Sequence, residues 1–159
     1  MSNKFIATTR FNEDTFQQYI SYKNKINTHQ CIYGSPIRIK EHIPLESYIY
    51  VIEMNNSQNK IKGIGLIINK HHPDKYYRIY NDQDYNRYIY KGKKRLDISL
   101  IKDPYYHKVI EVLEQLLFKG ERHCKRAQGI TELPQWILKN KYEFDFIKCF
   151  NNLFNKYLK

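Results

Sequence analysis

The sequence predicts an α+β fold in a single domain. Residues 43–68 have the pattern of a β-hairpin, residues 75–91 have the pattern of two further strands, and two amphipathic helices follow later in the chain. The 159 residues suffice for one sizeable core but are few for two ordinary domains. We therefore expect one domain over residues 1–159.

A strand and a helix are predicted first. Residues 4–8 read as a short strand, and the polar, acidic residues 12–14 suit a helix N-terminus. Thr8, Thr9 and Arg10 are then expected in the turn beyond the strand, where they could meet a phosphate or the edge of a base. The alternative is that the hydroxyls cap the helix and the arginine lies at the surface.

Residues 31–36 are expected to form a loop, because Gly34 and Pro36 lie among them, and residues 37–40 a brief strand. Within this loop, Tyr33 would be either the wall of a pocket or a cover for the edge of the core.

The strongest local pattern is the hairpin. Residues 45–54 are rich in β-branched and aromatic side chains, and residues 60–68 alternate in a second strand that places Gly63 and Gly65 on one face. The polar residues 55–59 suit the connection. Glycines in a strand leave room for a close approach of another group, or mark a bend.

A turn and a tyrosine-rich segment are predicted next. His71 and His72 are adjacent, so on an extended chain they point to opposite faces and do not suit one metal ion. The side chains expected on one face of two successive strands are Tyr76, Arg78 and Tyr80, then Tyr88 and Tyr90. Such a face suits the stacking of single-stranded nucleic acid, although a tyrosine-covered sheet packed on a helix is an equal alternative. An AT-rich genome would also explain the 15 tyrosines.

Two basic segments are candidates for phosphate contacts. The first contains Lys91, Lys93, Lys94 and Arg95. The second, within the irregular residues 119–136, contains Arg122, His123, Lys125 and Arg126, followed by Gln128. Cations on loops position a nucleic acid, and an amide carries the donor and acceptor that read a base.

Two helices frame the second basic segment. Asp103 and Pro104 open the first, which is expected to end at Gly120, and the second covers about residues 143–158. Both present an apolar face to the core. Trp136, between them, is predicted to be a core anchor.

Composition limits the function classes. Lysine and arginine number 27 against 16 acids, a net charge of +11, which favours an anionic partner over the alternative of a merely basic protein. The three cysteines form no CxxC pair, so we expect neither a disulfide framework nor a zinc site, but an intracellular, reducing compartment. The start of the chain lacks a signal-peptide pattern, and no apolar run is long enough for a membrane span.

The order of elements, with helices beside a partly closed barrel of about five to six strands, resembles the PUA-like superfamily, in particular its EVE and YTH-type modules. The resemblance is carried by residues 4–9, 43–52, 61–67 (IKGIGLI) and 129–133. The chain also looks like uncharacterised proteins of large eukaryotic DNA viruses, in the segments FIATTRFN, CIYGSPIRI, YRIY and KGERHCKRAQGIT.

Modules of this group bind RNA or modified bases, often in an aromatic pocket near the first strand and a late loop. The resemblance implies a site formed by Thr8, Thr9, Arg10, Tyr33, Ser35, Asn55 and the loop from Arg122 to Gln128. No tryptophan follows the opening strand or lies beside the hairpin, so a methyl cage built from tryptophan is not expected.

The leading hypothesis is a non-enzymatic module that binds nucleic acid without a cofactor. RNA is favoured over duplex DNA because neither amphipathic helix is a basic recognition helix. A second hypothesis is an ASCH-type enzyme or a nuclease that uses Glu121, His123 and Lys125 as acid, base and electrophile. It is less favoured because the sequence has no paired carboxylates, P-loop or metal-ligand spacing. A third is a virion or host-interaction protein whose tyrosines bind a protein partner.

Overall fold

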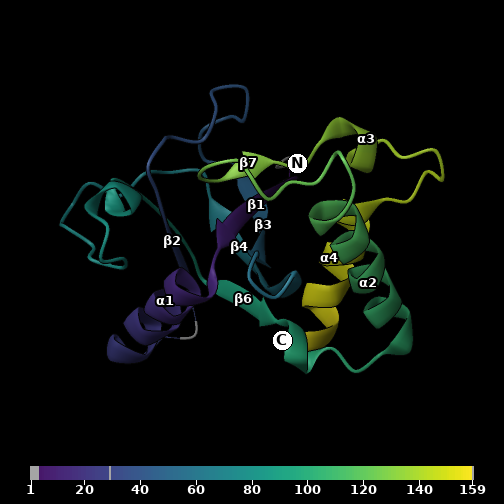
Figure 1. The fold of residues 1–159 in the computed structure, drawn as a ribbon, viewed down its shortest axis with the longest axis horizontal. Helices are drawn as coiled ribbons and strands as arrows, with labels where there is room; N and C mark the ends of the chain where they lie inside the picture. The colour runs from purple at the N-terminus through teal and green to yellow at the C-terminus, as the bar shows by residue number, and fades with distance from the viewer. Residues whose placement is uncertain (1–3, 29, 159) are drawn as a thin grey trace.

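The computed structural model describes residues 4–28 and 30–158, and it has the predicted α+β fold (Figure 1). The strands are β1 (Lys4–Phe11), β2 (Cys31–Ser35), β3 (Tyr48–Asn55), β4 (Lys60–Ile68), β5 (Tyr88–Gly92), β6 (Lys94–Asp97) and β7 (Thr131–Glu132). The helices are α1 (Glu13–Lys25), α2 (Pro104–Phe118), α3 (Gln135–Leu138) and α4 (Phe146–Tyr157), with 3₁₀ turns η1 (Gln83–Asn86) and η2 (Ile98–Leu100).

Five strands form a mixed sheet in the order β6-β4-β3-β1-β7, and β2 and β5 form a separate two-stranded sheet. The predicted hairpin is confirmed as β3 and β4, which pair from Tyr48 with Ile68 to Asn55 with Lys60. Strand β1 lies parallel to β3, and the other pairs are antiparallel. Over the described residues these strands do not close into a barrel.

Both faces of the five-stranded sheet are covered (Figure 1). Alternate residues of the central strands point to opposite faces. Ile6, Tyr50 and Ile52 pack with the apolar faces of α2 and α4. Ala7 and Val51, on the other face, pack with α1, β2 and β5. The sheet is therefore the middle of three layers.

The first strand is longer than predicted. β1 continues to Phe11 because it pairs with β3 along its whole length, so the expected turn at Thr8, Thr9 and Arg10 is wrong. The predicted helix start is confirmed, since the Asn12 side chain accepts a hydrogen bond from the backbone N–H of Thr15.

The structure of residues 31–40 is the opposite of the predicted one. Residues 31–35 form β2 rather than a loop, and residues 37–40 form no strand. Gly34 does not form a turn. It lets β2 pack closely against η1, because a Cβ at this position would overlap the backbone carbonyl of Tyr85.

The first tyrosine-rich strand is absent. The Asn86 side-chain oxygen accepts the N–H groups of Ile79 and Tyr80, at 3.1 and 2.9 Å, which holds this segment as an irregular loop. Tyr76, Arg78 and Tyr80 therefore do not share a strand face, and Tyr76 is exposed while Tyr80 is buried. The second strand is confirmed as β5, where Tyr90 is buried in the core.

The helices begin near the expected positions. Asp103 caps α2 by accepting the N–H of Tyr105, and Asp145 caps α4 by accepting the N–H of Lys148. Trp136 is not the predicted core anchor, because it is 37% exposed while the adjacent Ile137 is buried.

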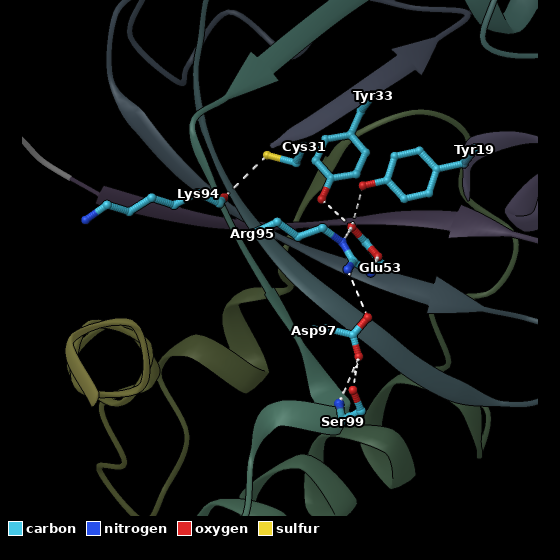
Figure 2. A network of polar contacts seen from close by, with 8 residues as sticks. All are labelled: Tyr19, Cys31, Tyr33, Glu53, Lys94, Arg95, Asp97 and Ser99. Atoms are coloured by element: carbon cyan, nitrogen blue, oxygen red, sulfur yellow. Dashed lines mark hydrogen bonds and ion pairs between the residues drawn. The ribbon is translucent and has the colours of Figure 1, made fainter. Parts of the chain in front are cut away.

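A buried polar network joins the layers around Glu53 of β3 (Figure 2). The Arg95 guanidinium of β6 donates to both Glu53 carboxylate oxygens, at 2.6 and 2.9 Å. The hydroxyls of Tyr19 and Tyr33 donate to the same carboxylate at 3.0 and 2.6 Å. Burial acts to raise the pKa of Glu53, but the Arg95 charge and these hydrogen bonds hold it below its usual value.

The two strand glycines make room for this network. A Cβ on Gly63 would lie 2.5 Å from the Arg95 guanidinium, and one on Gly65 would overlap the Tyr33 hydroxyl. The expectation that a group approaches these glycines closely is confirmed.

Replacing Glu53 with Gln is expected to lower the free energy of unfolding by about 3–5 kcal/mol, because Arg95 is then buried without its strongest partner. Urea-induced unfolding followed by circular dichroism measures this change. Glu41→Gln, at an exposed position, is the control and should change stability by less than about 0.5 kcal/mol. A loss that is no larger for Glu53→Gln than for the control would contradict the assigned role.

Lys23 of α1 lies close to this network and is also buried. Burial lowers the pKa of Lys23 to about 8, the nearby Arg95 charge acts in the same direction, and the carboxylate charges of Glu53 and Asp97 oppose both.

We expect the free energy of unfolding of the wild type to rise, relative to that of Lys23→Met, as the pH increases from 8 to 10.5. The folded protein releases the Lys23 proton near pH 8, whereas the unfolded chain holds it to about pH 10.5, and rising pH disfavours the state that binds more protons. Urea-induced unfolding at several pH values measures the difference. Lys25→Met, at an exposed position of the same helix, should give a curve parallel to the wild type, and a parallel curve for Lys23→Met would disprove the assignment.

Candidate functional site

A polar cavity of about 220 Å³ lies where β1 ends and α1 begins. Five parts of the chain form its walls: residues 9–12 with Thr15, the end of β2, the hairpin turn, Tyr80 with Tyr85 of η1, and residues 127–129. None of the described residues that line it is an aspartate or a glutamate. The cavity therefore combines distant parts of the sequence in a site without a lining carboxylate.

Among the residues that the structure describes, Arg10 is the one charged residue that lines this cavity. Its Nη1 donates to the Thr8 hydroxyl at 2.8 Å and to the Cys124 carbonyl at 3.1 Å. Its Nη2 donates to the Gly129 carbonyl at 2.7 Å and to the Thr131 hydroxyl at 2.9 Å. All of these acceptors are neutral, so among the described residues no carboxylate hydrogen-bonds to this guanidinium.

The positive charge of Arg10 persists at neutral pH. Burial lowers the pKa of the guanidinium to about 10, and the nearby Cys124 thiol acts in the opposite direction. A buried cation without a counter-ion is costly, so an anion or a strong acceptor in the cavity would be stabilised there.

Two polar atoms of cavity-lining residues are buried without a hydrogen-bond partner in the described structure: Arg10 Nε, a donor, and Asn56 Oδ1, an acceptor. Buried polar groups normally have partners, so each unpaired atom calls for an explanation. Both residues line the cavity, so an unpartnered donor and an unpartnered acceptor lie just beneath its surface.

Aromatic rings form the apolar part of the wall. Phe11 and Tyr80 lie with their ring centroids 6.4 Å apart, and Tyr80 and Tyr85 pack edge to face at 6.2 Å. Tyr80 is buried, whereas Tyr85 is 37% exposed. Tyr85 therefore presents ring surface to solvent at the cavity.

The loop before β7 is held over this site from two sides. Arg10 binds the carbonyls of Cys124 and Gly129, and the Asn56 amide nitrogen donates to the Lys125 carbonyl at 2.9 Å. The Lys125 ammonium donates to Asn59 Oδ1 at 2.7 Å. The loop is therefore preformed rather than free at the surface.

The structure brings some of the predicted site residues together. Those that line the cavity are Thr9, Arg10, Tyr80 and Gln128. Thr8 and Ser35 lie behind the wall: the Thr8 hydroxyl accepts from Arg10, and a Cβ on Gly129 would lie 2.5 Å from Ser35 Oγ. These two residues support the site but do not line it.

Three predicted residues are buried in contacts within the protein. Tyr33 and Arg95 bind Glu53, so Arg95 does not offer a surface cation for phosphate. The Asn55 side chain accepts the N–H groups of Ser57 and Gln58 and stabilises its own turn.

The remaining predicted residues lie outside the cavity wall. Lys93 and Lys94 are exposed at the far end of β2, since Gly92 pairs with Cys31 there. Figure 2 shows Lys94 pointing away from the Glu53 network. Tyr76 and Arg78 are exposed on the irregular loop before η1.

The basic loop is divided between two surfaces. The Arg122 guanidinium lies over the Trp136 ring at 5.3 Å, and the His123 ring accepts the N–H of Lys125. Lys125 is engaged with the hairpin turn, whereas Arg126 is exposed next to the lining residue Ala127. Glu121, His123 and Lys125, the candidate catalytic set, do not line the cavity.

Sequence reasoning missed Phe11, Asn56 and Tyr85 as parts of the site. Phe11 continues the strand pattern after Arg10, so a longer β1 would have included it. Asn56 stands next to Asn55 in a turn where both read as local hydrogen-bonding residues. No local signal distinguishes the one that faces the cavity.

The described residues contain no group of three or more His, Cys, Asp or Glu side chains that could hold a metal ion. No described helix has the length and hydropathy needed to cross a membrane. Cys31, Cys124 and Cys149 are free thiols. Comparisons of the chain with protein family models, curated proteins and solved structures found no match.

Arg10→Met is expected to speed tryptic cleavage after Lys125 and Arg126 by at least about tenfold, because the loop loses hydrogen bonds worth roughly 1.5–3 kcal/mol each. Mass spectrometry of a time course under native conditions locates the cuts. Arg78→Met, at an exposed position, should leave the rate unchanged. Unfolding measured in parallel separates local opening from global loss of stability, and an unchanged cleavage rate would show that Arg10 does not hold the loop.

Proposed function

We propose that this protein is a non-enzymatic module that binds single-stranded RNA and holds one unpaired base in the cavity beside Arg10. The observation that carries the proposal is Arg10, a guanidinium whose hydrogen-bond acceptors are all neutral, at an aromatic cavity that no described carboxylate lines.

The size and chemistry of the cavity favour a single base. Its volume of about 220 Å³ is below the ~300–1,000 Å³ of sites for drug-sized ligands. A base edge carries acceptors and donors in one plane, which match an arginine donor and an amide acceptor. The exposed ring surface of Tyr85 suits stacking.

A single strand is favoured over a duplex because a base must leave its stack to enter a cavity of this kind. Arg126 and Gln128, exposed beside the cavity, are placed for contacts to the adjoining phosphates and base edges. The net charge of +11 would strengthen such binding at low salt.

The resemblance to PUA-like modules supports the same proposal. It implies a base held between the first strand and a late loop, and the cavity lies between β1 and residues 127–129. We therefore propose that the fold is a PUA-like architecture that is not closed into a barrel. In it, β2 and β5 form a separate two-stranded sheet beside the five-stranded sheet. An intracellular, reducing compartment fits both the free thiols and an RNA ligand.

Tyr85→Ala is expected to weaken binding of short single-stranded RNA by about 1–3 kcal/mol, because a stacking ring is lost. Fluorescence anisotropy with labelled oligonucleotides of each base, plain and base-methylated, measures the affinity. Tyr85→Phe should retain it, and Tyr142→Ala, an exposed tyrosine outside the cavity, is the matched control.

The same titrations test the role of charge. Arg126→Gln should reduce the slope of log K against log salt by about 0.7 for one lost phosphate contact. If single-stranded DNA or duplex DNA binds as tightly as single-stranded RNA, the proposed preference for single-stranded RNA is wrong. No salt-dependent binding to any oligonucleotide would refute the proposal.

A further inference from the structure

A second hollow, of about 780 Å³, lies between α2, α3 and the chain that joins α3 to α4. Its apolar lining includes Val109, Val112 and Leu116 on one wall and Trp136 and Phe144 on the other. We call it the α2–α3 groove. It shares no lining residue with the cavity beside Arg10, so it is a separate feature of the surface.

One wall of the groove is a partly exposed stripe of α2, in which Val109 is buried in the core and Leu116 packs against it. Tyr105, Val109, Val112 and Leu116 follow one another at spacings of four, three and four residues, so they share a helix face. This stripe extends over three turns, roughly 16 Å along the helix axis. Tyr105 is 59% and Val112 is 44% exposed, although the opposite face of α2 is in the core.

The other wall is held in place by Asn140. Its amide nitrogen donates to the carbonyls of Ile137 and Phe144, and its amide oxygen accepts the N–H of Phe144. Phe144 packs edge to face on Phe146 at 4.8 Å. Because these polar groups are satisfied within the wall, the groove presents a preformed and mainly apolar surface.

The charged residues that line the groove are all cations: Lys108, Arg122 and Lys141. Arg122 lies against the Trp136 ring, and the Lys141 ammonium lies 5.2 Å from the centre of the Tyr142 ring. Lys108 is paired with Glu111 at 3.8 Å, but both side chains are largely exposed, so this pair is weak. An apolar floor with a cationic rim is complementary to an amphipathic segment with acidic flanks.

We infer that the α2–α3 groove binds an acidic, amphipathic helical segment of a partner protein. A helix places apolar side chains at the spacing of the α2 stripe and can fill a groove three turns long. A second copy of this chain is disfavoured by mutual repulsion at +11, and nucleic-acid phosphates would not fill an apolar floor. The inference does not depend on the proposed RNA binding.

Trp136 is the single tryptophan of the chain and lines the groove, so its fluorescence reports occupancy directly. The probe is a helical peptide of about 18 residues with leucines at the i, i+4, i+7 and i+11 positions, glutamates only on the two flanks of this stripe, alanines elsewhere, and neither Trp nor Tyr. We expect a saturable blue shift of Trp136 emission. The same peptide with lysines in place of glutamates should give none.

Variants separate the apolar and the electrostatic contributions. Val112→Glu should weaken peptide binding by at least about tenfold, because it places a negative charge on the apolar α2 wall, where it repels the glutamates of the peptide. Arg122→Gln and Lys141→Gln should each weaken it by about two- to fivefold, and less at high salt. Tyr85→Ala, which lies in the other cavity, should bind the peptide as the wild type does, and unfolding curves verify that each variant is folded.

Three results would overturn the inference. The first is no saturable change in Trp136 emission, or an equal change with the lysine peptide. The second is a shift with anionic phospholipid vesicles but not with the glutamate peptide. The third is concentration-dependent dimerisation that Val112→Glu abolishes, which would assign the groove to a second copy of the chain.

Discussion

The pairing of Arg95 with Glu53 is the constraint on which the arrangement of the layers depends. A carboxylate on the inner face of β3 is tolerated only because a guanidinium and two phenol groups reach it. These groups come from β6 of the same sheet and from α1 and β2 of the neighbouring layer, so a single buried charge ties an edge strand and two covering elements to β3. Two of these elements also line the cavity, α1 through Thr15 and β2 through Gly34, so the position of these two walls depends on this pair.

Arg10 and Arg95 show how differently two arginines can be compensated within one structure. Arg95 is matched by carboxylates on either side, Glu53 and Asp97. Arg10 has only hydroxyls and carbonyls, and one of its nitrogen atoms has no acceptor at all among the described residues. A compensated cation stabilises the fold, whereas an uncompensated one leaves binding energy available to a ligand. The proposed function depends on this contrast more than on the total charge.

Local patterns predicted the hairpin, α2 and α4 because alternation, caps and helical spacing lie within each segment. They could not predict β2, because Gly34 is required there by close packing against the backbone of Tyr85, some fifty residues later in the chain. Nor could they predict that hydrogen bonds to the Asn86 side chain would hold residues 79 and 80 in an irregular loop. Arg95 looked like a surface cation because its partner is 42 positions away. Arg10 was identified by its place after a strand, but Asn56 was not, because its neighbour Asn55 has the same local chemistry and a purely structural role.

The parallel pairing of β1 with β3, and the pairing of β1 with β7 on its other edge, have a consequence for the order of folding. The hairpin of β3 and β4 closes through neighbours in sequence and β1 can then pair with β3, whereas the other edge of β1 must wait for β7, more than 120 residues later. The loop over Arg10 can close only when that late strand docks. During synthesis, a sheet with most of its hydrogen bonds would therefore exist before the cavity has a complete wall, and the candidate site would be among the last parts of the structure to form.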